Sequence, residues 1–422
     1  MKKIICFSLI LTAAVTMTSC EKKATDSDKD TDGNVIISPT ESTSVTATVD
    51  ITENTAAASS EDVSENDDYL DIDYYVPPVQ LPDALSEGRE NVRADGFVYT
   101  DYLGSEYDSL ALIALDDKYV YFEKWICNFS NCPDMSFYKY DLTTDESTEF
   151  NGIVPGFNVK TGDTAFVDGR IYSVMYGSEG RIHYSLDTLT NSAEIIQKGE
   201  GNDSLMRTTH AVGKDSYVEI WATGQGYNQT IHVMLFNKSG SREIITKKYN
   251  SSKERLVYTA NGDHIYEYAQ TSDSTEPCLN IYNENGELES SVCLKEIAYE
   301  LKQDPDNYVA QMNVSGRFIS FDFNFGESTA KSYIYDMEIG SYYRADCCQS
   351  IATPNYLPPD FGKILFLQRN SDSEGTKFDL FCLYANGGIE KLSENIGIDT
   401  MIVANGEKVA YFKNKELYTI EY

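Results

Sequence analysis

The sequence predicts an all-β domain, and more specifically a seven-bladed β-propeller of four-stranded antiparallel blades. Three observations predict it. One alternating apolar strand pattern recurs seven times, each copy is followed by further short strands separated by turns, and tyrosine dominates the aromatic residues (31 Tyr, 18 Phe, 2 Trp). β-Branched and aromatic residues in short alternating runs are typical of half-buried strands.

The recurring strand sets the repeat length. Its seven copies begin at Val120, Ile171, Val218, Ile265, Phe318, Ile364 and Val409, so consecutive starts are 45 to 53 residues apart. Four short strands with their turns require about this length. A weaker strand and a small turn precede most copies, and a third strand follows each. Stacking seven such meanders around an axis buries their apolar faces, whereas a β-sandwich array or a β-helix does not explain the period.

The last repeat stops at Tyr422 after its third strand. The extended segment Gly96–Tyr102 precedes the first full repeat and is predicted to supply the missing strand, so that an N-terminal strand closes the ring. Closure of this kind removes an exposed sheet edge. The propeller domain is therefore expected to span residues 91–422.

These repeats resemble the bacterial extracytoplasmic members of the WD-repeat-like and YWTD-like propeller group. The resemblance covers roughly residues 95–422. No Trp-Asp or Tyr-Trp-Thr-Asp signature occurs in the chain. The resemblance therefore implies the architecture and transfers no functional residue.

The first 20 residues have the three parts of an export signal. Lys2 and Lys3 are basic, Ile4–Val15 is apolar, and Thr18-Ser19 are small. Cys20 follows directly, and this end of the signal resembles the lipobox of bacterial lipoproteins. The resemblance implies that Cys20 is lipidated and holds the protein on a membrane outside the cytoplasm. An ordinary signal peptide cleaved near the same place is the alternative.

Residues 21–90 differ sharply in composition from the repeats. Residues 21–68 are rich in Ser, Thr, Asp and Glu and nearly lack aromatics. Such a stretch cannot bury enough apolar surface to offset its chain entropy, which predicts a disordered acidic tether. The sequence leaves open whether Tyr69–Pro82, with its tyrosines and prolines, packs on the propeller instead.

The formal net charge of −33 restricts the partners. Nucleic acid is not expected as a partner, and an anionic membrane surface would repel the chain, so attachment depends on the lipid anchor. The protein is expected to be a monomer. No cofactor and no metal site are predicted, because there is no C-x-x-C pair and the four histidines lack metal-ligand spacing.

Nine cysteines are present, and export makes disulfides permissible. The best-placed pair is Cys278 and Cys293. If Asn285-Gly286 forms a two-residue type I′ turn, counting outward places Cys278 opposite Cys293 in a hydrogen-bonded pair. Cys127 and Cys132 could close one loop. The alternative is that all these thiols are reduced and fill apolar space.

By analogy with other propellers, ligands are expected at the loops between the second and third strands and at the loops between blades, which share one rim of the central channel. The candidate binding residues combine aromatic rings with carboxamides and are Tyr227, Trp125, Gln225, Asn228 and Tyr176. Tyr227 is the strongest, because a lone tyrosine among polar turn residues has no obvious core role. The alternative for Trp125 and Tyr176 is that they end buried strands.

These observations predict a lipid-anchored binding or scaffold module of the cell envelope that recognises a protein or glycan through the loop rim. No G-x-S-x-G elbow, H-E-x-x-H pair, P-loop or dinucleotide fingerprint occurs, so enzymatic activity is not the favoured interpretation. The alternative is a glycan-active hydrolase or lyase whose residues converge from several blades. A carboxylate pair with perturbed pKa values would favour it.

Overall fold

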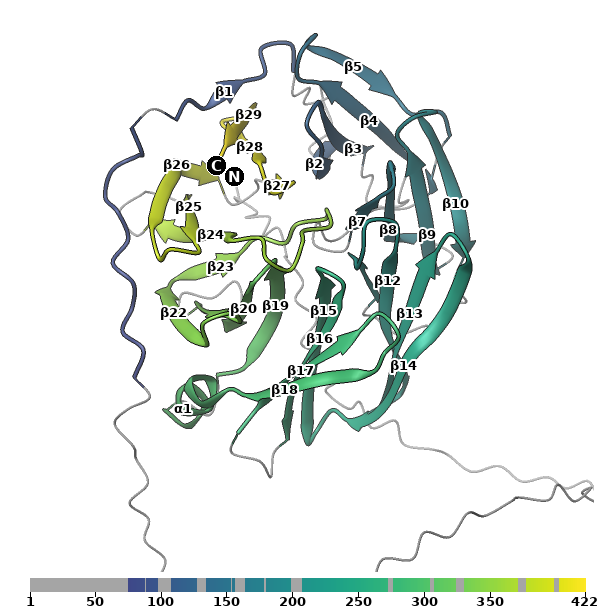
Figure 1. The fold of residues 1–422 in the computed structure, drawn as a ribbon. Coiled ribbons are helices and arrows are strands. Elements are labelled where there is room, and N and C mark those ends of the chain that lie inside the picture. The colour runs from purple at the N-terminus through teal and green to yellow at the C-terminus, as the bar shows by residue number, and fades with distance from the viewer. Residues whose placement is uncertain are drawn as a thin grey trace, which may run out of the picture. The chain divides into compact units, whose positions relative to one another are not determined.

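The computed structural model describes residues 75–87, 89–97, 108–126, 134–152, 154–155, 164–177, 180–198, 207–271, 276–303, 307–323, 330–370, 377–397 and 402–422. Within them, seven antiparallel sheets form a ring (Figure 1). The predicted fold class, a seven-bladed propeller with four-stranded blades, is confirmed. The predicted signal peptide, Cys20 and the predicted tether as far as residue 74 lie outside the described residues.

Each blade is a meander whose first strand lies nearest the centre of the ring. Blade 1 contains β2 (Asp108–Leu115), β3 (Tyr119–Ile126), β4 (Asp134–Asp141) and β5 (Glu146–Glu149), with β6 (Val154–Pro155) beside β4. Blade 2 contains β7 (Thr164–Val167), β8 (Arg170–Gly177), β9 (Gly180–Asp187) and β10 (Ser192–Lys198). Blade 3 contains β11 (Arg207–Ala211), β12 (Tyr217–Gln225), β13 (Asn228–Asn237) and β14 (Gly240–Asn250).

The remaining blades repeat this order. Blade 4 contains β15 (Glu254–Asn261), β16 (His264–Thr271), β17 (Cys278–Asn283) and β18 (Leu288–Cys293). Blade 5 contains β19 (Val309–Ser315), β20 (Phe318–Phe323), β21 (Lys331–Asp336) and β22 (Ser341–Asp346). Blade 6 contains β23 (Cys348–Ser350), β24 (Lys363–Asn370), β25 (Lys377–Tyr384) and β26 (Ile389–Gly397). Blade 7 contains β27 (Ile402–Ala404), β28 (Lys408–Lys413) and β29 (Glu416–Glu421).

An N-terminal strand completes blade 7, as predicted, but it is β1 (Val92–Arg93) and not Gly96–Tyr102. Val92 pairs with Thr419 of β29, and Ala94 N donates to Leu417 O at 2.9 Å. Pairing stops there because the chain turns inward, with Phe97 N donating to Ala94 O. The buried ring of Phe97 then packs between blades 7 and 1.

The segment before β1 lies along the outside of the ring. Val79 N donates to Arg344 O of β22 at 2.8 Å, and Ser86 N donates to Lys391 O of β26 at 3.2 Å. Figure 1 shows it passing outside these two strands on its way to β1. Residues 75–82, whose role the sequence left open, therefore pack on blades 5 and 6.

One helix, α1 (Lys295–Gln303), interrupts the described strands between blades 4 and 5. Its buried Glu300 accepts a hydrogen bond from Tyr333 Oη at 2.7 Å and pairs with Lys331, which fixes the helix to blade 5. The insertion explains why the repeat starting at Ile265 is the longest. Within the described part of the chain, no helix is long and apolar enough to cross a membrane.

The connection between β23 and β24, residues 351–362, crosses the centre of the ring and is called the crossing loop here (Figure 1). Its Pro354 O accepts from Phe166 N of blade 2 at 2.8 Å, and its Leu357 N donates to Asn261 Oδ1 of blade 4, also at 2.8 Å. Further contacts with blades 1, 5 and 7 join Asn355 to Leu115, Phe361 to Arg317 and Leu357 to Gly406.

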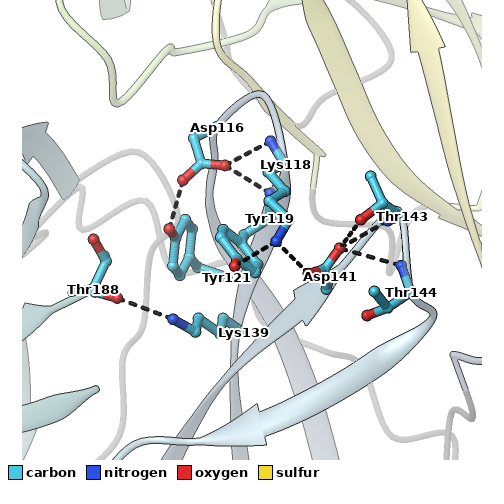
Figure 2. A network of polar contacts seen from close by, with 9 residues as sticks. All are labelled: Asp116, Lys118, Tyr119, Tyr121, Lys139, Asp141, Thr143, Thr144 and Thr188. Carbon is cyan, nitrogen blue, oxygen red and sulfur yellow. Dashed lines mark hydrogen bonds and ion pairs between the residues drawn. The ribbon is translucent and has the colours of Figure 1, made fainter. Parts of the chain in front are cut away.

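Side-chain caps stabilise the turns on this side of the ring. In blade 1, Asp141 Oδ1 accepts hydrogen bonds from Thr143 N and Thr144 N, while Asp141 Oδ2 lies 2.8 Å from Lys118 Nζ (Figure 2). These contacts, of which the Lys118 bond is the largest, hold the pKa of Asp141 well below its ordinary value. An Asp or Asn caps the corresponding turn in five further blades, namely Asp187, Asn237, Asn283, Asp336 and Asn386.

Candidate functional site

Two B–C connections, which join the second and third strands of a blade, lie wholly within the described residues. In blade 7 it is the tight turn Asn414-Lys415. In blade 3 it is the turn Gly226-Tyr227, flanked by the cross-strand pair Gln225 and Asn228. Tyr227, the strongest predicted candidate, stands at this tip with 67% of its surface exposed.

The backbone of the blade-3 tip is held in place. Gly226 has φ +60°, the positive value that a two-residue hairpin turn requires at its first central position. Tyr227 O accepts a hydrogen bond from Ser251 N at 2.8 Å, which joins the tip to the chain leaving β14. The exposed tyrosine ring is therefore presented from a fixed turn.

One face of this hairpin is polar, and we call it the blade-3 polar face. It consists of three cross-strand pairs, Trp221–His232, Thr223–Thr230 and Gln225–Asn228. Side chains alternate between the faces of a sheet, so these six share one face. Gln225 and Asn228 are exposed and the other four are partly exposed. The face thus offers one indole ring, two carboxamides, two hydroxyls and an imidazole.

A chain of hydrogen bonds orders the inner part of the blade-3 polar face. His232 Nδ1 lies 2.5 Å from Glu243 Oε1, and His232 Nε2 lies 2.8 Å from Thr223 Oγ1. The bond from His232 lowers the pKa of Glu243. The imidazole also stacks on Trp221, with ring centroids 5.2 Å apart. These contacts fix the imidazole and place the indole beside it.

The opposite face of the same strands is apolar and buried. Its side chains pack against Tyr258, Ala260 and Ile265 of blade 4, and they are Val218, Ile220, Ala222, Ile231, Val233 and Leu235. The polar face is therefore carried by a rigid sheet. This one-sided alternation was present in the sequence, but only Gln225 and Asn228 were predicted, and Trp221 and His232 were missed because the prediction considered loops alone.

The structure assigns the other predicted ligand candidates to strands. Trp125 lies in β3 opposite Ser109, and Tyr176 lies in β8 opposite Arg181. Their side chains lie outside the described part of the structure. Their role in binding stays a prediction.

Buried ionisable groups lie between blades, and one of them, Glu219, is on the same face of β12 as Trp221. His183 Nδ1 and Glu219 Oε1 are 2.8 Å apart, with each side chain 1% exposed, at the contact of blades 2 and 3. Asp322 of blade 5 is fully buried, and burial raises the pKa of its carboxyl to about 6. The described residues contain no group of three His, Cys, Asp or Glu placed to hold a metal.

Cys278 and Cys293 lie opposite each other, but the turn that places them there differs from the predicted one. Gly286 N donates to Asn283 O, so the turn has three residues, and a bulge at position 289 restores the register. Leu294 N donates to Pro277 O at 2.9 Å, which makes the cysteines a non-hydrogen-bonded pair and not the predicted hydrogen-bonded one. Both thiols are free in the structure, and the disulfide stays a prediction. Cys127 and Cys132 lie outside the described residues.

The blade-3 polar face and the crossing loop lie on opposite sides of the ring. β12 begins at Tyr217, next to the A–B turn of blade 3, and ends at Gln225 at the hairpin tip. The crossing loop contacts A–B turns of other blades, including Gly262 and Gly316. A ligand on the polar face would therefore approach from the side that the crossing loop leaves free.

Comparisons with known proteins give similarities of fold only. No protein-family model matches the chain, and no curated protein matches it. Among solved structures, oligogalacturonate lyase from Vibrio parahaemolyticus is 12% identical, with 75% of this chain and 90% of that chain covered and a TM-score of 0.46.

Two structures from Pyrococcus species are also similar in fold. Acylaminoacyl peptidase from Pyrococcus horikoshii is 11% identical, with 75% of this chain and 52% of that chain covered and a TM-score of 0.49. The β-propeller domain of the Trilobed protease from Pyrococcus furiosus is 13% identical, with 68% and 84% covered and a TM-score of 0.43. One fold hosts many activities, so none of these activities is transferred to this chain.

Proposed function

We propose that this protein is a lipid-anchored binding or scaffold module of the bacterial cell envelope, and that it takes a protein or glycan on the blade-3 polar face and its tip. The observation that supports this most is the one-sided hairpin. Its apolar face packs on blade 4, whereas the outer end of its other face and the tip leave two carboxamides and the Tyr227 ring exposed. Aromatic rings beside polar groups are enriched where proteins bind partners.

The propeller supports such a role mechanically. The ring is closed by β1 and tied across its centre by the crossing loop, so the polar face belongs to a rigid body. Little ordering of the protein would then oppose binding. The N-terminal sequence would supply the membrane attachment through Cys20, and the acidic residues 21–68 would separate the domain from the lipid surface.

The binding role is tested by immunoprecipitating the full-length protein from detergent-solubilised envelopes of the producing cells. Tyr227→Ala and Gln225→Ala should each reduce the recovered envelope partner at least fivefold. Tyr75→Ala is a matched control, because it also removes an exposed tyrosine, 59% accessible, but from the segment beside blades 5 and 6. Equal recovery with all three variants would refute a binding role for this hairpin.

The anchor is tested separately. Cys20→Ser should abolish incorporation of radiolabelled palmitate and release the protein from the membrane pellet into the soluble extracytoplasmic fraction. A variant that stays in the pellet without label would contradict the lipid anchor. It would leave the binding role of the propeller intact.

A further inference from the structure

We infer that Arg255 and Gln270 form a second binding site, between blades 4 and 5, for a ligand that carries a single carboxylate. The site goes beyond the proposed function, because neither residue belongs to the blade-3 polar face or its tip. It follows from the place of Arg255 in the ring, from its contacts, from the donors beside it and from the charge of the neighbouring chain.

Arg255 lies on the side of the ring that the crossing loop leaves free. It is the second residue of β15, the innermost strand of blade 4, and β15 runs from there to Asn261, which contacts the crossing loop. Arg255 Nε donates to Val309 O at 2.8 Å, and Val309 is the first residue of β19, the innermost strand of blade 5. Figure 1 shows both strands next to the centre of the ring. The guanidinium therefore lies where these two innermost strands begin.

No described acid neutralises the charge of Arg255. Besides the bond to Val309 O, its Cζ atom lies 4.3 Å from the ring centroid of Tyr308. The adjacent Glu254 is engaged elsewhere, because its Oε2 accepts a hydrogen bond from Asn250 N at 2.8 Å. Burial lowers the pKa of the Arg255 guanidinium, although much of the side chain is exposed. A cation held partly away from water gains more from a bound anion than a cation in bulk solvent does.

Arg255 and Gln270 together present hydrogen-bond donors. Because Nε is bonded to Val309 O, Nη1 and Nη2 of Arg255 remain, and this end of the guanidinium can bind both oxygens of a carboxylate. Gln270 pairs directly with Arg255 across β15 and β16, so the two side chains share one face of the sheet. Gln270 Oε1 accepts a hydrogen bond from Tyr268 Oη at 2.8 Å, so its carboxamide presents the NH2 group. A set of donors selects a ligand that accepts.

The charge near the site favours an anion, and the charge of the whole protein limits its size. Residues 248–255 contain the basic residues Lys248, Lys253 and Arg255, whereas Glu254 is the one acid among them, and both lysines are exposed. Charges more than about 8 Å apart in solvent are largely screened at physiological ionic strength, so this local excess determines the sign. The net charge of −33 still opposes a polyanion. A ligand with one carboxylate and no other charge satisfies both conditions.

A purely structural role for Arg255 is the competing explanation. Its bond to Val309 O and its contact with Tyr308 both join blade 4 to blade 5. Such a role requires no ligand, and it predicts only a loss of stability when Arg255 is replaced. The experiments must therefore measure binding at the guanidinium itself.

Modification by phenylglyoxal, which reacts with accessible guanidinium groups, tests the site in the full-length protein. The adduct at Arg255 is quantified by peptide mass spectrometry. The probes are galacturonate, lactate and benzoate, each compared with its uncharged counterpart, galactose, lactamide or benzamide. At least one carboxylate should slow the modification about fivefold or more relative to its counterpart, because a bidentate contact covers Nη1 and Nη2. Arg369, an exposed arginine near the end of β24 in blade 6, is the control and should react equally with every probe.

Substitutions at Gln270 test the donor set without removing Arg255. Gln270→Leu should reduce the protection of Arg255 about threefold, because one donor is lost. Gln270→Glu should abolish the protection, because it places a carboxylate directly opposite Arg255. Arg255→Lys should weaken binding of the protecting carboxylate about tenfold in saturation-transfer NMR, because lysine lacks the planar fork. Arg369→Gln should leave this binding unchanged. Gln270 is partly exposed, so its variants remain informative if Arg255→Lys fails to fold.

Equal modification rates with each carboxylate and its uncharged counterpart would overturn the inference. Stronger protection by oligogalacturonate or inorganic phosphate than by any monocarboxylate would also overturn it. Asp304 and Asp306 precede Tyr308 in the sequence and lie outside the described residues. If protection appears only when one of them is replaced by Asn, that acid is the partner of Arg255 and the inference is wrong. None of these outcomes bears on the immunoprecipitation test of the blade-3 hairpin, so the two hypotheses fail separately.

Discussion

The carboxyl group of Asp322 is fully buried in blade 5 and accepts hydrogen bonds from two serines. Ser350 donates to its Oδ2 from N at 3.2 Å and from Oγ at 2.7 Å, and Ser332 Oγ donates to its Oδ1 at 2.7 Å. No Lys, Arg or His of the described residues is paired with it, and the nearby Cys348 thiol is itself buried, with its pKa raised well above the ordinary value by burial. Burial therefore outweighs three hydrogen bonds and raises the pKa of Asp322 from 3.8 to about 6.

Asp322→Asn should change the pH dependence of stability. Because the pKa is higher in the folded state than in the unfolded state, the folded protein binds the proton more tightly between pH 4 and pH 6. Stability from this group is present at low pH and is lost as pH rises through 6. The amide cannot ionise, so from pH 4 to pH 7.5 the variant should gain up to about 3 kcal/mol relative to wild type.

Urea unfolding of both proteins across this pH range measures the gain. Asp360→Asn, in the exposed part of the crossing loop, is the control and should follow the wild-type profile. A constant difference between Asp322→Asn and wild type at every pH would contradict the raised pKa.

The strand register that places Cys278 opposite Cys293 predicts a disulfide between them. A non-hydrogen-bonded pair brings Cα atoms to about 4.5 Å, within the range that a disulfide spans. In air-oxidised protein, peptides containing the two cysteines should be linked in mass spectrometry without reduction. Closing a loop of this size should add about 3 kcal/mol. Reductant should therefore lower the melting temperature of wild type but not of Cys278→Ser, and equal effects on both would disprove the disulfide.

At the scale of elements, the sequence predicted strands better than their ends. The alternation in Phe318–Asp322 identified β20, because every second side chain must enter a core. The closing strand was placed too late, since Phe97 and the residues after it read as extended although Phe97 turns inward. Gly96 allows this turn, because a Cβ there would lie 2.4 Å from Asp145 O. No local pattern reports such a distant contact.

Phe97→Ala should destabilise the closure of the ring. The Phe97 ring is 8% exposed and lies 5.1 Å from the ring of Phe122 in blade 1 and 5.6 Å from that of Phe412 in blade 7, measured between centroids. Truncating a buried phenylalanine costs about 3 kcal/mol or more. Val92→Ala is the control, because Val92 is 60% exposed and should cost little. Similar urea midpoints for the two variants would mean that Phe97 does not stabilise the contact between blades 7 and 1.

At the scale of the whole molecule, the number of blades could be predicted from the sequence. The contacts that the crossing loop makes with several blades could not. Seven copies of one strand pattern give seven blades whatever their details. The crossing loop instead joins residues far apart in the chain, such as Asn355 Nδ2 and Leu115 O, which are 240 positions apart. The blade-3 polar face was half predicted for a similar reason. The turn at its tip can be recognised in the sequence. The orientation of the His232 ring, however, depends on a contact with Glu243 of the neighbouring strand β14.

Asn261→Ala tests how far the crossing loop holds the ring together. The buried Asn261 side chain accepts from Leu357 N at 2.8 Å and donates to Asn355 O at 3.2 Å, so the substitution leaves a buried backbone amide without its partner. That loss costs about 2 kcal/mol. Hydrogen exchange at the Leu357 amide should accelerate by ten- to a hundredfold, while exchange at Val233, inside blade 3, should not change. Asn285→Ala in an exposed turn is the control. If exchange accelerated equally in every blade, Asn261 would be stabilising the whole ring and not the crossing loop alone.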